Sequence, residues 1–317
     1  MRIRATGAAI VGALALSTLA VPAAQADNSL DRKDKSALVQ AVRAAQQADS
    51  GAAQASGRAA SAAEDGVPYE LDLSFSQVKV NNGKPIVVGV SNQVTVPVTY
   101  TVTHGADVDI FAPDFLMDVE IYRGGTDYWS QTHGLLGDEW PVCTAVSSTV
   151  ATCKGTIDIY PEFDLTLADA TTWKTYGYAV AYNGQDPEDE NIDLSQVGVV
   201  EQDPLGVTTK LQRYSKLTVN ASPEPVVKGK TITVTGKLTR ANWETHKYAG
   251  YTKQPVKLQF RKAGTSTYTT VKTVYTDGYG NLKTTRTAST DGYWRWSFAG
   301  TSTTPAVNAT GDYVDVK

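Results

Sequence analysis

The segment VTVPVTYTVT, residues 94–103, alternates apolar and polar side chains and gives the clearest indication of the fold class. The valines and Tyr100 fall on one side of an extended chain, and the threonines and Pro97 fall on the other. A two-residue period of this kind predicts a β-strand with one buried face. Because proline has no N–H to donate to a neighbouring strand, we expect a sheet edge or a bulge at Pro97.

The same period recurs along the chain after residue 66, and turn residues such as Asn-Asn-Gly (81–83) and Asn-Gly (183–184) separate the runs. No long amphipathic helix follows residue 66, which argues against a parallel α/β sheet. We therefore predict an all-β chain with two antiparallel β-sandwich domains, residues 67–212 and 213–317. The alternating runs are 71–75, 119–121, 176–182, 232–238, 256–260 and 294–298.

The first 66 residues differ from the rest of the chain. Two arginines precede an apolar run from Ala8 to Val21, and a small-x-small cleavage pattern follows at Ala24–Ala26. We expect residues 1–26 to be a signal peptide and the mature protein to be secreted, extracellular and without an integral membrane segment. Residues 27–66 are rich in alanine and lack aromatic side chains, which predicts a partly helical or disordered tether.

Residues 215–317 resemble a bacterial immunoglobulin-like domain. The segments SPEPVVKG (222–229) and TITVTG (231–236) are similar to the first two strands of such domains, and TDGYGN (276–281) and GYWRWSFAG (292–300) are similar to their late strands. The whole chain resembles exported proteins of actinobacteria. The resemblance implies an immunoglobulin-like sandwich, an extracellular location and a role in spacing or adhesion at the cell surface, and it brings no catalytic residue with it.

The two cysteines of the chain, Cys143 and Cys153, are expected to form a disulfide. Folding this segment about Ser148 places Cys143 opposite Cys153, with both side chains on one side of a hairpin. Export to an oxidising compartment favours the bond. Their spacing matches neither a CxxC motif nor a zinc pair, which argues against a redox or metal role.

The net charge of −4 hides a division between the two predicted domains. Residues 67–212 hold six Lys or Arg and twenty-one Asp or Glu, whereas residues 213–317 hold sixteen Lys or Arg and six Asp or Glu. Opposite fields of this size predict docking of the domains or binding of an external polyanion, such as an anionic cell-wall polymer, by the basic domain. Solubility alone is the remaining explanation. Nucleic acid is not an expected partner of an exported protein.

A basic, aromatic segment of the second domain is a candidate ligand site. Trp243, Lys247, Tyr248 and Tyr251 lie in what we expect to be a long loop between strands. Loops on a rigid sandwich often carry binding residues, and aromatic rings beside lysine suit stacking on a carbohydrate or wall polymer. Packing of this loop over the sandwich is the alternative interpretation.

The first domain contains two acidic sets that raise the question of calcium. Calcium needs several carboxylate oxygens that converge on one point, and neither set has the order of an EF-hand loop. A solvated acidic loop is therefore the alternative for each. The first set is Asp186, Glu188, Asp189, Glu190 and Asp193, and the second is Asp107, Asp109, Asp114 and Asp118.

We assign no catalytic residue. The chain lacks Gly-x-Ser-x-Gly, His-Glu-x-x-His and phosphate-loop motifs, and its three histidines and two cysteines leave little for zinc, haem or iron–sulfur ligation. Calcium is the one cofactor that we consider. The favoured function is a secreted, non-catalytic binding or structural module of the cell envelope. The alternatives are a secreted hydrolase with its site in the acidic domain and a calcium-binding extracellular protein.

Overall fold

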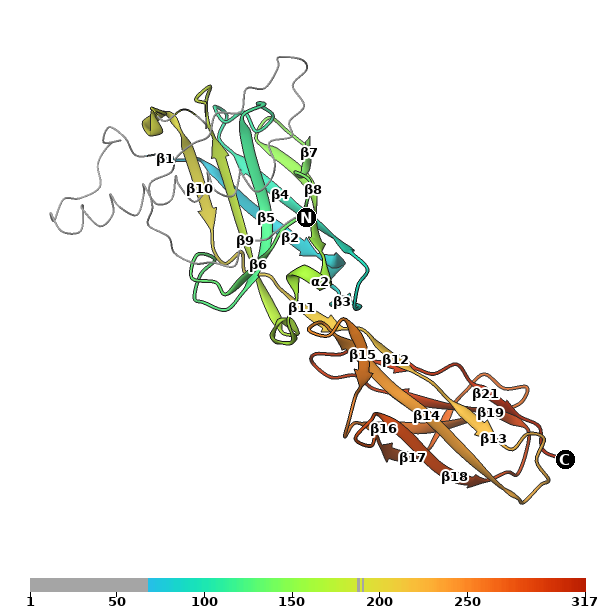
Figure 1. Ribbon diagram of the computed structural model, residues 1–317. Helices are drawn as coiled ribbons and strands as arrows, with labels where there is room; N and C mark the ends of the chain where they lie inside the picture. The colour runs from blue at the N-terminus through green and yellow to red at the C-terminus, as the bar shows by residue number, and fades with distance from the viewer. Residues whose placement is uncertain (1–67, 187–188, 190) are drawn as a thin grey trace, which may run out of the picture. The chain divides into compact units, whose positions relative to one another are not determined.

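The computed structural model describes residues 68–317 except 187, 188 and 190. The predicted signal peptide (1–26) and tether (27–66) lie outside these residues. The described chain is all-β, as predicted, with one short α-helix, and it divides into two compact units (Figure 1). The domain boundary expected at residue 212 stays a prediction. The described parts of unit 1 are 68–83, 95–159 and 174–208, and those of unit 2 are 84–94, 160–173 and 209–317.

Unit 1 is a sandwich of two sheets. One sheet has the strand order β1-β10-β9-β5-β6, and the other has the order β2-β4-β8-β7 (Figure 1). The short β1 pairs in parallel with β10, whereas β5, β9 and β10 pair antiparallel. The elements are β1 (Tyr69–Glu70), β2 (Leu73–Val80), η1 (Asn81–Gly83), β4 (Val94–His104), β5 (Phe115–Arg123), β6 (His133–Leu135), β7 (Val142–Ala145), β8 (Val150–Ile159), β9 (Thr172–Ala181), η3 (Leu194–Gln196) and β10 (Gly198–Gln202).

Strand β4 confirms the predicted alternation and corrects the expectation about Pro97. Val96, Val98 and Val102 are buried, but β4 lies between β2 and β8 and is not an edge strand. Pro97 is tolerated on the side of β2 because the last β2–β4 pair is Val80 with Val98, so Pro97 itself has no partner residue in β2. The register irregularity lies instead in β2, between Ser76 and Lys79.

Both predicted turns of unit 1 are present. Asn81 and Asn82 have φ values of 50° and 54° at the end of β2, and Asn183 and Gly184 have φ values of 52° and 82° after β9. Asparagine and glycine tolerate this left-handed region better than other residues do. No helix within 68–186, 189 and 191–317 has both the length and the hydropathy needed to cross a membrane.

One face of the β1-β10-β9-β5-β6 sheet carries a cluster of tyrosines. Phe75 of β2 lies against Gly177, so the alternate residues Tyr176 and Tyr178 point to the opposite face of β9. The rings of Tyr176 and Tyr128 stack there with their centroids 4.0 Å apart. Tyr128 belongs to the loop between β5 and β6, and the stacking therefore fixes that loop on the sheet.

Three phenols of this cluster donate hydrogen bonds to carboxylates. The hydroxyl of Tyr176 donates to Glu201 Oε1 at 2.8 Å, and that of Tyr122 donates to Asp203 Oδ1 at 2.5 Å. Tyr128 donates to Glu120 Oε2, whose residue is only 2% exposed. These hydrogen bonds satisfy carboxylates on β5, on β10 and just after β10 that lie against the aromatic cluster and that would otherwise cost free energy.

Unit 2 contains a second sandwich over residues 215–317. One sheet has β12, β13, β15 and β18 paired with β14, and the other has the order β17-β16-β19 with β20 and β21 also paired to β19 (Figure 1). The elements of unit 2 are β3 (Ile86–Val88), α2 (Pro161–Asp164), η2 (Leu167–Asp169), β11 (Thr208–Arg213), β12 (Ser215–Leu217), β13 (Asn220–Ser222), β14 (Thr231–Asn242), β15 (Lys247–Gly250), β16 (Pro255–Lys262), β17 (Thr269–Tyr275), β18 (Asn281–Thr287), β19 (Gly292–Phe298), β20 (Val307–Asn308) and β21 (Asp312–Val314).

This strand order is that of an immunoglobulin-type sandwich. In chain order, β13, β14 and β18 occupy the positions of strands A, B and E, and β16, β19 and β21 occupy those of C, F and G. Strand β17 pairs with β16 at the edge of the second sheet, which is the position of strand C′ in variable-type immunoglobulin domains. The expectation of an immunoglobulin-like domain is thus met by the pairing of its strands.

The core of this sandwich follows the predicted alternation. Trp294, Trp296 and Phe298 of β19 are buried beside Val256 and Leu258 of β16. Ile232, Val234 and Leu238 of β14 close the core from the other sheet. The indole Nε1 of Trp296 donates to the backbone oxygen of Thr235 at 2.9 Å, which ties β19 to β14 across the core.

The cysteine hairpin has the predicted register. Cys143 pairs with Cys153 in the β7–β8 ladder, and the two residues form a disulfide with their Cα atoms 4.0 Å apart. The turn is centred on Ser148, and the Val146 N–H donates to the Val150 oxygen at 2.8 Å. The bond therefore closes a short loop in unit 1.

Removal of the disulfide should destabilise unit 1. We expect the C143S/C153S double variant to lose about 2–3 kcal/mol of unfolding free energy, because the unfolded chain regains the entropy of a short closed loop. Urea denaturation at equal protein concentration measures the difference, with T144S on the same strand as the control. Equal midpoints for the double variant and the wild type would contradict the expectation.

Alkaline pH should also destabilise unit 1. Burial raises the pKa of Tyr182 to about 12, and burial followed by the Glu201 carboxylate raises that of Tyr176 further. Burial and the bond to Asp203 raise the pKa of Tyr122 as well. The folded chain thus holds these phenols neutral at a pH at which the unfolded chain ionises them. Their contribution to the unfolding free energy is therefore complete below pH 10 and is lost as the pH rises toward 12.

Absorbance at 295 nm and circular dichroism, followed together from neutral pH upward, check this expectation. The ionisation of the buried tyrosines should coincide with the loss of structure. Y182F should lose less stability over the same range, and it should not be weakened at pH 7, because no hydrogen-bond partner of its buried hydroxyl lies among the described residues. Full ionisation in the folded state would refute the assignment.

Candidate functional site

The solvent side of the β17-β16-β19-β21 sheet carries tyrosine and arginine side chains. Because Trp294 and Trp296 face the core, the alternate residues Tyr293 and Arg295 point outward. The register pairs Arg261 with Tyr293 and Gln259 with Arg295, and β21 adds Tyr313 opposite Tyr293. We call this surface the Tyr–Arg face, and it comprises Lys257, Gln259, Arg261, Tyr268, Tyr293, Arg295 and Tyr313.

The cations of the Tyr–Arg face are held by aromatic rings. Arg295 Cζ lies 3.8 Å from the centroid of the Tyr268 ring, and Arg261 Cζ lies 4.0 Å from that of Tyr293. Tyr293 in turn contacts Tyr313, with 5.1 Å between centroids. Guanidinium groups that stack on rings keep their N–H donors in a fixed plane, which lowers the entropy lost on binding.

Hydrogen bonds fix the two guanidinium groups further. Arg295 Nε donates to Gln259 Oε1 at 2.8 Å, and Arg261 Nη1 donates to the Thr265 oxygen at 2.5 Å. Neither group forms an ion pair with a carboxylate in the part of the chain that the structure describes. The Tyr–Arg face therefore offers positive charge, unused donors and aromatic surface together, a combination that suits anionic and polyhydroxylated ligands.

The charge imbalance follows the two compact units. Unit 1, taken from residue 68, holds four Lys or Arg and eighteen Asp or Glu, a net charge of −14. Unit 2 holds eighteen Lys or Arg and nine Asp or Glu, a net charge of +9. The Tyr–Arg face thus belongs to a unit whose whole field favours anions.

The structure does not bring the four predicted aromatic and basic residues into one exposed group. Trp243 is 0% exposed, and its Nε1 donates to the Gly89 oxygen at 2.8 Å, so neither side of its ring is available for stacking. Tyr251 is half-buried against the sandwich core. The expected long loop is instead a hairpin, in which β15 pairs with β14 and brings Lys247 opposite Asn242.

Tyr248 on this hairpin contacts Lys216, a lysine outside the four predicted residues. Lys216 Nζ lies 3.7 Å from the centroid of its ring, and Tyr214 approaches it edge-on at 6.3 Å. Burial raises the pKa of Tyr248. At the start of β15, Lys247 is exposed and Tyr248 is half-buried, so their ligand-binding role stays a prediction. The buried ring of Trp243 adds no stacking surface to them.

Two described aspartates of the acidic segment 186–193 accept hydrogen bonds from backbone N–H groups that follow them in unit 1. Asp189 Oδ1 accepts the Asn191 N–H at 2.9 Å, and Asp193 Oδ1 accepts the Ser195 N–H at 3.0 Å at the start of η3. Glu188 and Glu190 lie outside the described residues. Within the described ranges, no three His, Cys, Asp or Glu side chains are placed to hold a metal ion. The calcium role of Asp186, Asp189 and Asp193 stays a prediction.

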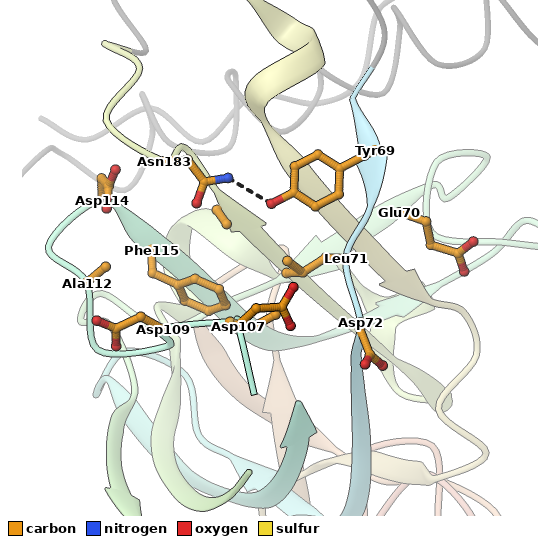
Figure 2. Close-up of a pocket in the computed structure, with 12 residues that line it drawn as sticks. Tyr69, Glu70, Leu71, Asp72, Asp107, Asp109, Ala112, Asp114, Phe115 and Asn183 are labelled. Carbon is orange, nitrogen blue, oxygen red and sulfur yellow. Dashed lines mark hydrogen bonds between the residues drawn. The ribbon is translucent and has the colours of Figure 1, made fainter. Parts of the chain in front are cut away.

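Much of the second acidic set lines a pocket of about 240 Å³ in unit 1 (Figure 2). Asp107, Asp109 and Asp114 reach it from the loop between β4 and β5, whereas Asp118 is buried within β5. The full lining is Tyr69, Glu70, Leu71, Asp72, Asp107, Val108, Asp109, Ala112, Asp114, Phe115, Ala181 and Asn183.

The upper wall of this acidic pocket is tied together by the turn after β9. Asn183 Nδ2 donates to the Tyr69 hydroxyl at 2.7 Å, as Figure 2 shows, and the Gly184 N–H donates to Asp114 Oδ2 at 2.6 Å. A Cβ atom on Gly105 would lie 2.7 Å from Asp107 Oδ1 and 2.9 Å from Asp72 Oδ2. Two carboxylates therefore converge over a position that only glycine fills without displacing them.

The acidic pocket gives little support to a hydrolase. Glycoside hydrolysis by two carboxyl groups needs one of them in an apolar enclosure, where it acts as the proton donor. Glu70, Asp72, Asp107 and Asp109 are all exposed. The pocket supplies hydrogen-bond acceptors and negative potential, and no Lys, Arg or His lines it.

Sequence reasoning missed the Tyr–Arg face, although the signal for it was present. GYWRWSF (292–298) alternates large apolar residues with Tyr293, Arg295 and Ser297. Burial of Trp294 and Trp296 already implies that the residues between them face solvent. Tyr268 and Tyr313 had no such signal, because their positions depend on pairing and loop contacts between distant segments.

Comparison with known proteins assigns no family. No protein-family model matches the chain, and no curated protein matches it. Among solved structures, the D00–D0 domain of intimin is 14% identical over 75% of this chain and 98% of its own, with a TM-score of 0.24. The adhesin InvE of Yersinia pseudotuberculosis is 15% identical over 77% of this chain and 60% of its own, with a TM-score of 0.23. Domains A168–A170 of titin are 8% identical over 79% of this chain and 68% of their own, also with a TM-score of 0.23. Scores this low carry no weight here, and the fold assignment rests on the strand order given above.

Proposed function

We propose that this chain is a non-catalytic extracellular binding module, whose unit 2 holds an anionic polymer of the cell envelope on the Tyr–Arg face. The observation that carries the proposal is the pair of stacked guanidinium groups, Arg261 and Arg295, presented by adjacent strands of a rigid sheet. A repeating phosphate polymer offers one negative charge per unit, which suits a row of fixed cations.

Other features of the chain support an extracellular binding role. The disulfide between Cys143 and Cys153 is of the kind that persists in oxidising compartments. The net charge of +9 on unit 2 would steer a polyanion toward it at low salt. Four expectations from the sequence belong to the same proposal. They are secretion by the N-terminal signal, an actinobacterial source, carbohydrate as an alternative ligand, and docking of the two units.

Binding of a glycerol phosphate polymer to the full chain tests the proposal. We expect R261Q/R295Q to bind about tenfold more weakly than the wild type, a loss of about 1.4 kcal/mol, because two partly exposed cations each contribute about 0.5–1 kcal/mol. Calorimetric titration over a salt series measures both the affinity and its salt dependence. The salt dependence should be shallower for the variant.

The matched control is K237Q/K283Q, which removes the same charge from the outer side of the other sheet. Lys237 on β14 and Lys283 on β18 are both exposed. Each lies next to a buried residue of its own strand, so both side chains point away from the core. The control should bind within about twofold of the wild type if position matters. Equal losses in the two double variants would mean that net charge alone attracts the polymer, and the assignment to the Tyr–Arg face would then fail.

A further inference from the structure

The inner face of β14 ends in an arginine where the core pattern calls for an apolar residue. Ile232, Val234 and Leu238 point into the sandwich, and Arg240 is next in the alternation. Arg240 pairs with Ser215 of β12, which is itself only 2% exposed. Directly opposite residues of an antiparallel pair share a face, so Arg240 is directed toward this end of the sandwich interior.

A second arginine joins it on the same side. Arg213 lies two residues before Ser215 and is only 6% exposed. The Ala241 N–H donates to the Tyr214 oxygen, so the pairing continues past Ser215 and makes Arg213 the diagonal neighbour of Arg240. Arg213 Nε donates to the Ala241 oxygen at 2.6 Å, which fixes its guanidinium group beside β14.

The groups around these two arginines are neutral. Arg240 Nη1 lies 3.4 Å from the hydroxyls of Thr303 and Thr304, and its Cζ lies 3.8 Å from the centroid of the Tyr251 ring. The Tyr251 hydroxyl and Thr301 Oγ1 are 3.3 Å apart beside them. Neither arginine forms an ion pair with any carboxylate that the structure describes, and Glu244 acts on Arg213 only from a distance.

Two neighbouring like charges with no carboxylate beside them are costly when they are withdrawn from water, and here Arg213 is buried and Arg240 is half-buried. Burial, followed by the neighbouring Arg240, lowers the pKa of Arg213 to about 10, and burial lowers that of Arg240 as well. Buried charges in proteins are normally paired, and the charged form of arginine persists in almost every environment. The two guanidinium groups are therefore suited to an anionic partner.

We propose that this end of the unit 2 sandwich is a binding site for a phosphate-type oxyanion, held by Arg213 and Arg240 with the hydroxyls of Tyr251, Thr301 and Thr303 around it. Two guanidinium groups match the oxygens of a tetrahedral oxyanion in number and charge, and threonine and tyrosine hydroxyls supply further donors. The site is separate from the Tyr–Arg face, whose arginines lie on β16 and β19, and it does not depend on the function proposed above.

Thermal denaturation of the full chain in inorganic phosphate tests the site. When phosphate replaces chloride at constant ionic strength, the melting temperature should rise in a saturable way, by about 3–6 °C at a concentration ten times the dissociation constant. R240Q should lose this rise. K237Q, which removes a charge from the outer side of the same strand, should keep it. An equal rise when acetate replaces chloride, or a full rise in R240Q, would overturn the proposal.

Arginine Nε–H resonances of the wild-type chain provide a test that no variant's folding affects. Saturable shifts of the Arg213 and Arg240 signals on titration with phosphate would support the site, and unchanged signals would exclude it. A parallel titration with a glycerol phosphate polymer separates the two sources of the anion. Shifts with phosphate alone indicate a small free anion, whereas shifts with both indicate that the site also takes the phosphate groups of a polymer.

Discussion

Burial of Trp296 is the contact on which the described surface of unit 2 depends. Its ring is fully enclosed between the two sheets, and its Nε1 donates to the Thr235 oxygen on β14. This contact sets the phase of β19, because a strand shifted by one residue turns every side chain to the opposite face. With Trp296 inside, Arg295 must lie outside, and the β16 register brings Arg261 onto the same surface. The sandwich core and the Tyr–Arg face are therefore two consequences of one alternation.

The two units divide the chemistry of the chain between them. Unit 1 concentrates carboxylates in the acidic pocket and on the face where Glu120 is capped by Tyr128. Unit 2 concentrates arginines, some on the Tyr–Arg face and two, the buried Arg213 and the half-buried Arg240, at one end of the sandwich. Within the residues that the structure describes, no three His, Cys, Asp or Glu side chains are placed to hold a metal ion. Both units present charged, hydrogen-bonding groups on a sandwich scaffold.

Local patterns predicted the parts of the fold that depend on near neighbours. The cysteine register follows from a hairpin centred on Ser148, and the buried strands follow from the two-residue period. The errors lie where distant segments decide the outcome. Pro97 suggested an edge strand, but β4 lies between β2 and β8, and the proline is tolerated because the β2 pairing reaches only as far as Val98. Trp243 suggested an exposed ring, but the segment around Gly89, more than 150 residues earlier, covers it. The inward direction of Arg240 also needs the β12–β14 register, which the charge pattern does not contain.

Hydroxyl-radical footprinting of the full chain with a glycerol phosphate polymer shows whether the Tyr–Arg face is the surface that binds, because it reads the exposure of individual tyrosine side chains. We expect the polymer to protect Tyr268, Tyr293 and Tyr313. Tyr279, which is 76% exposed and lies outside the Tyr–Arg face, should be oxidised as fast as in the free chain. Protection of Tyr279, or of Tyr69 in the acidic pocket, with no change at the Tyr–Arg face would contradict that expectation.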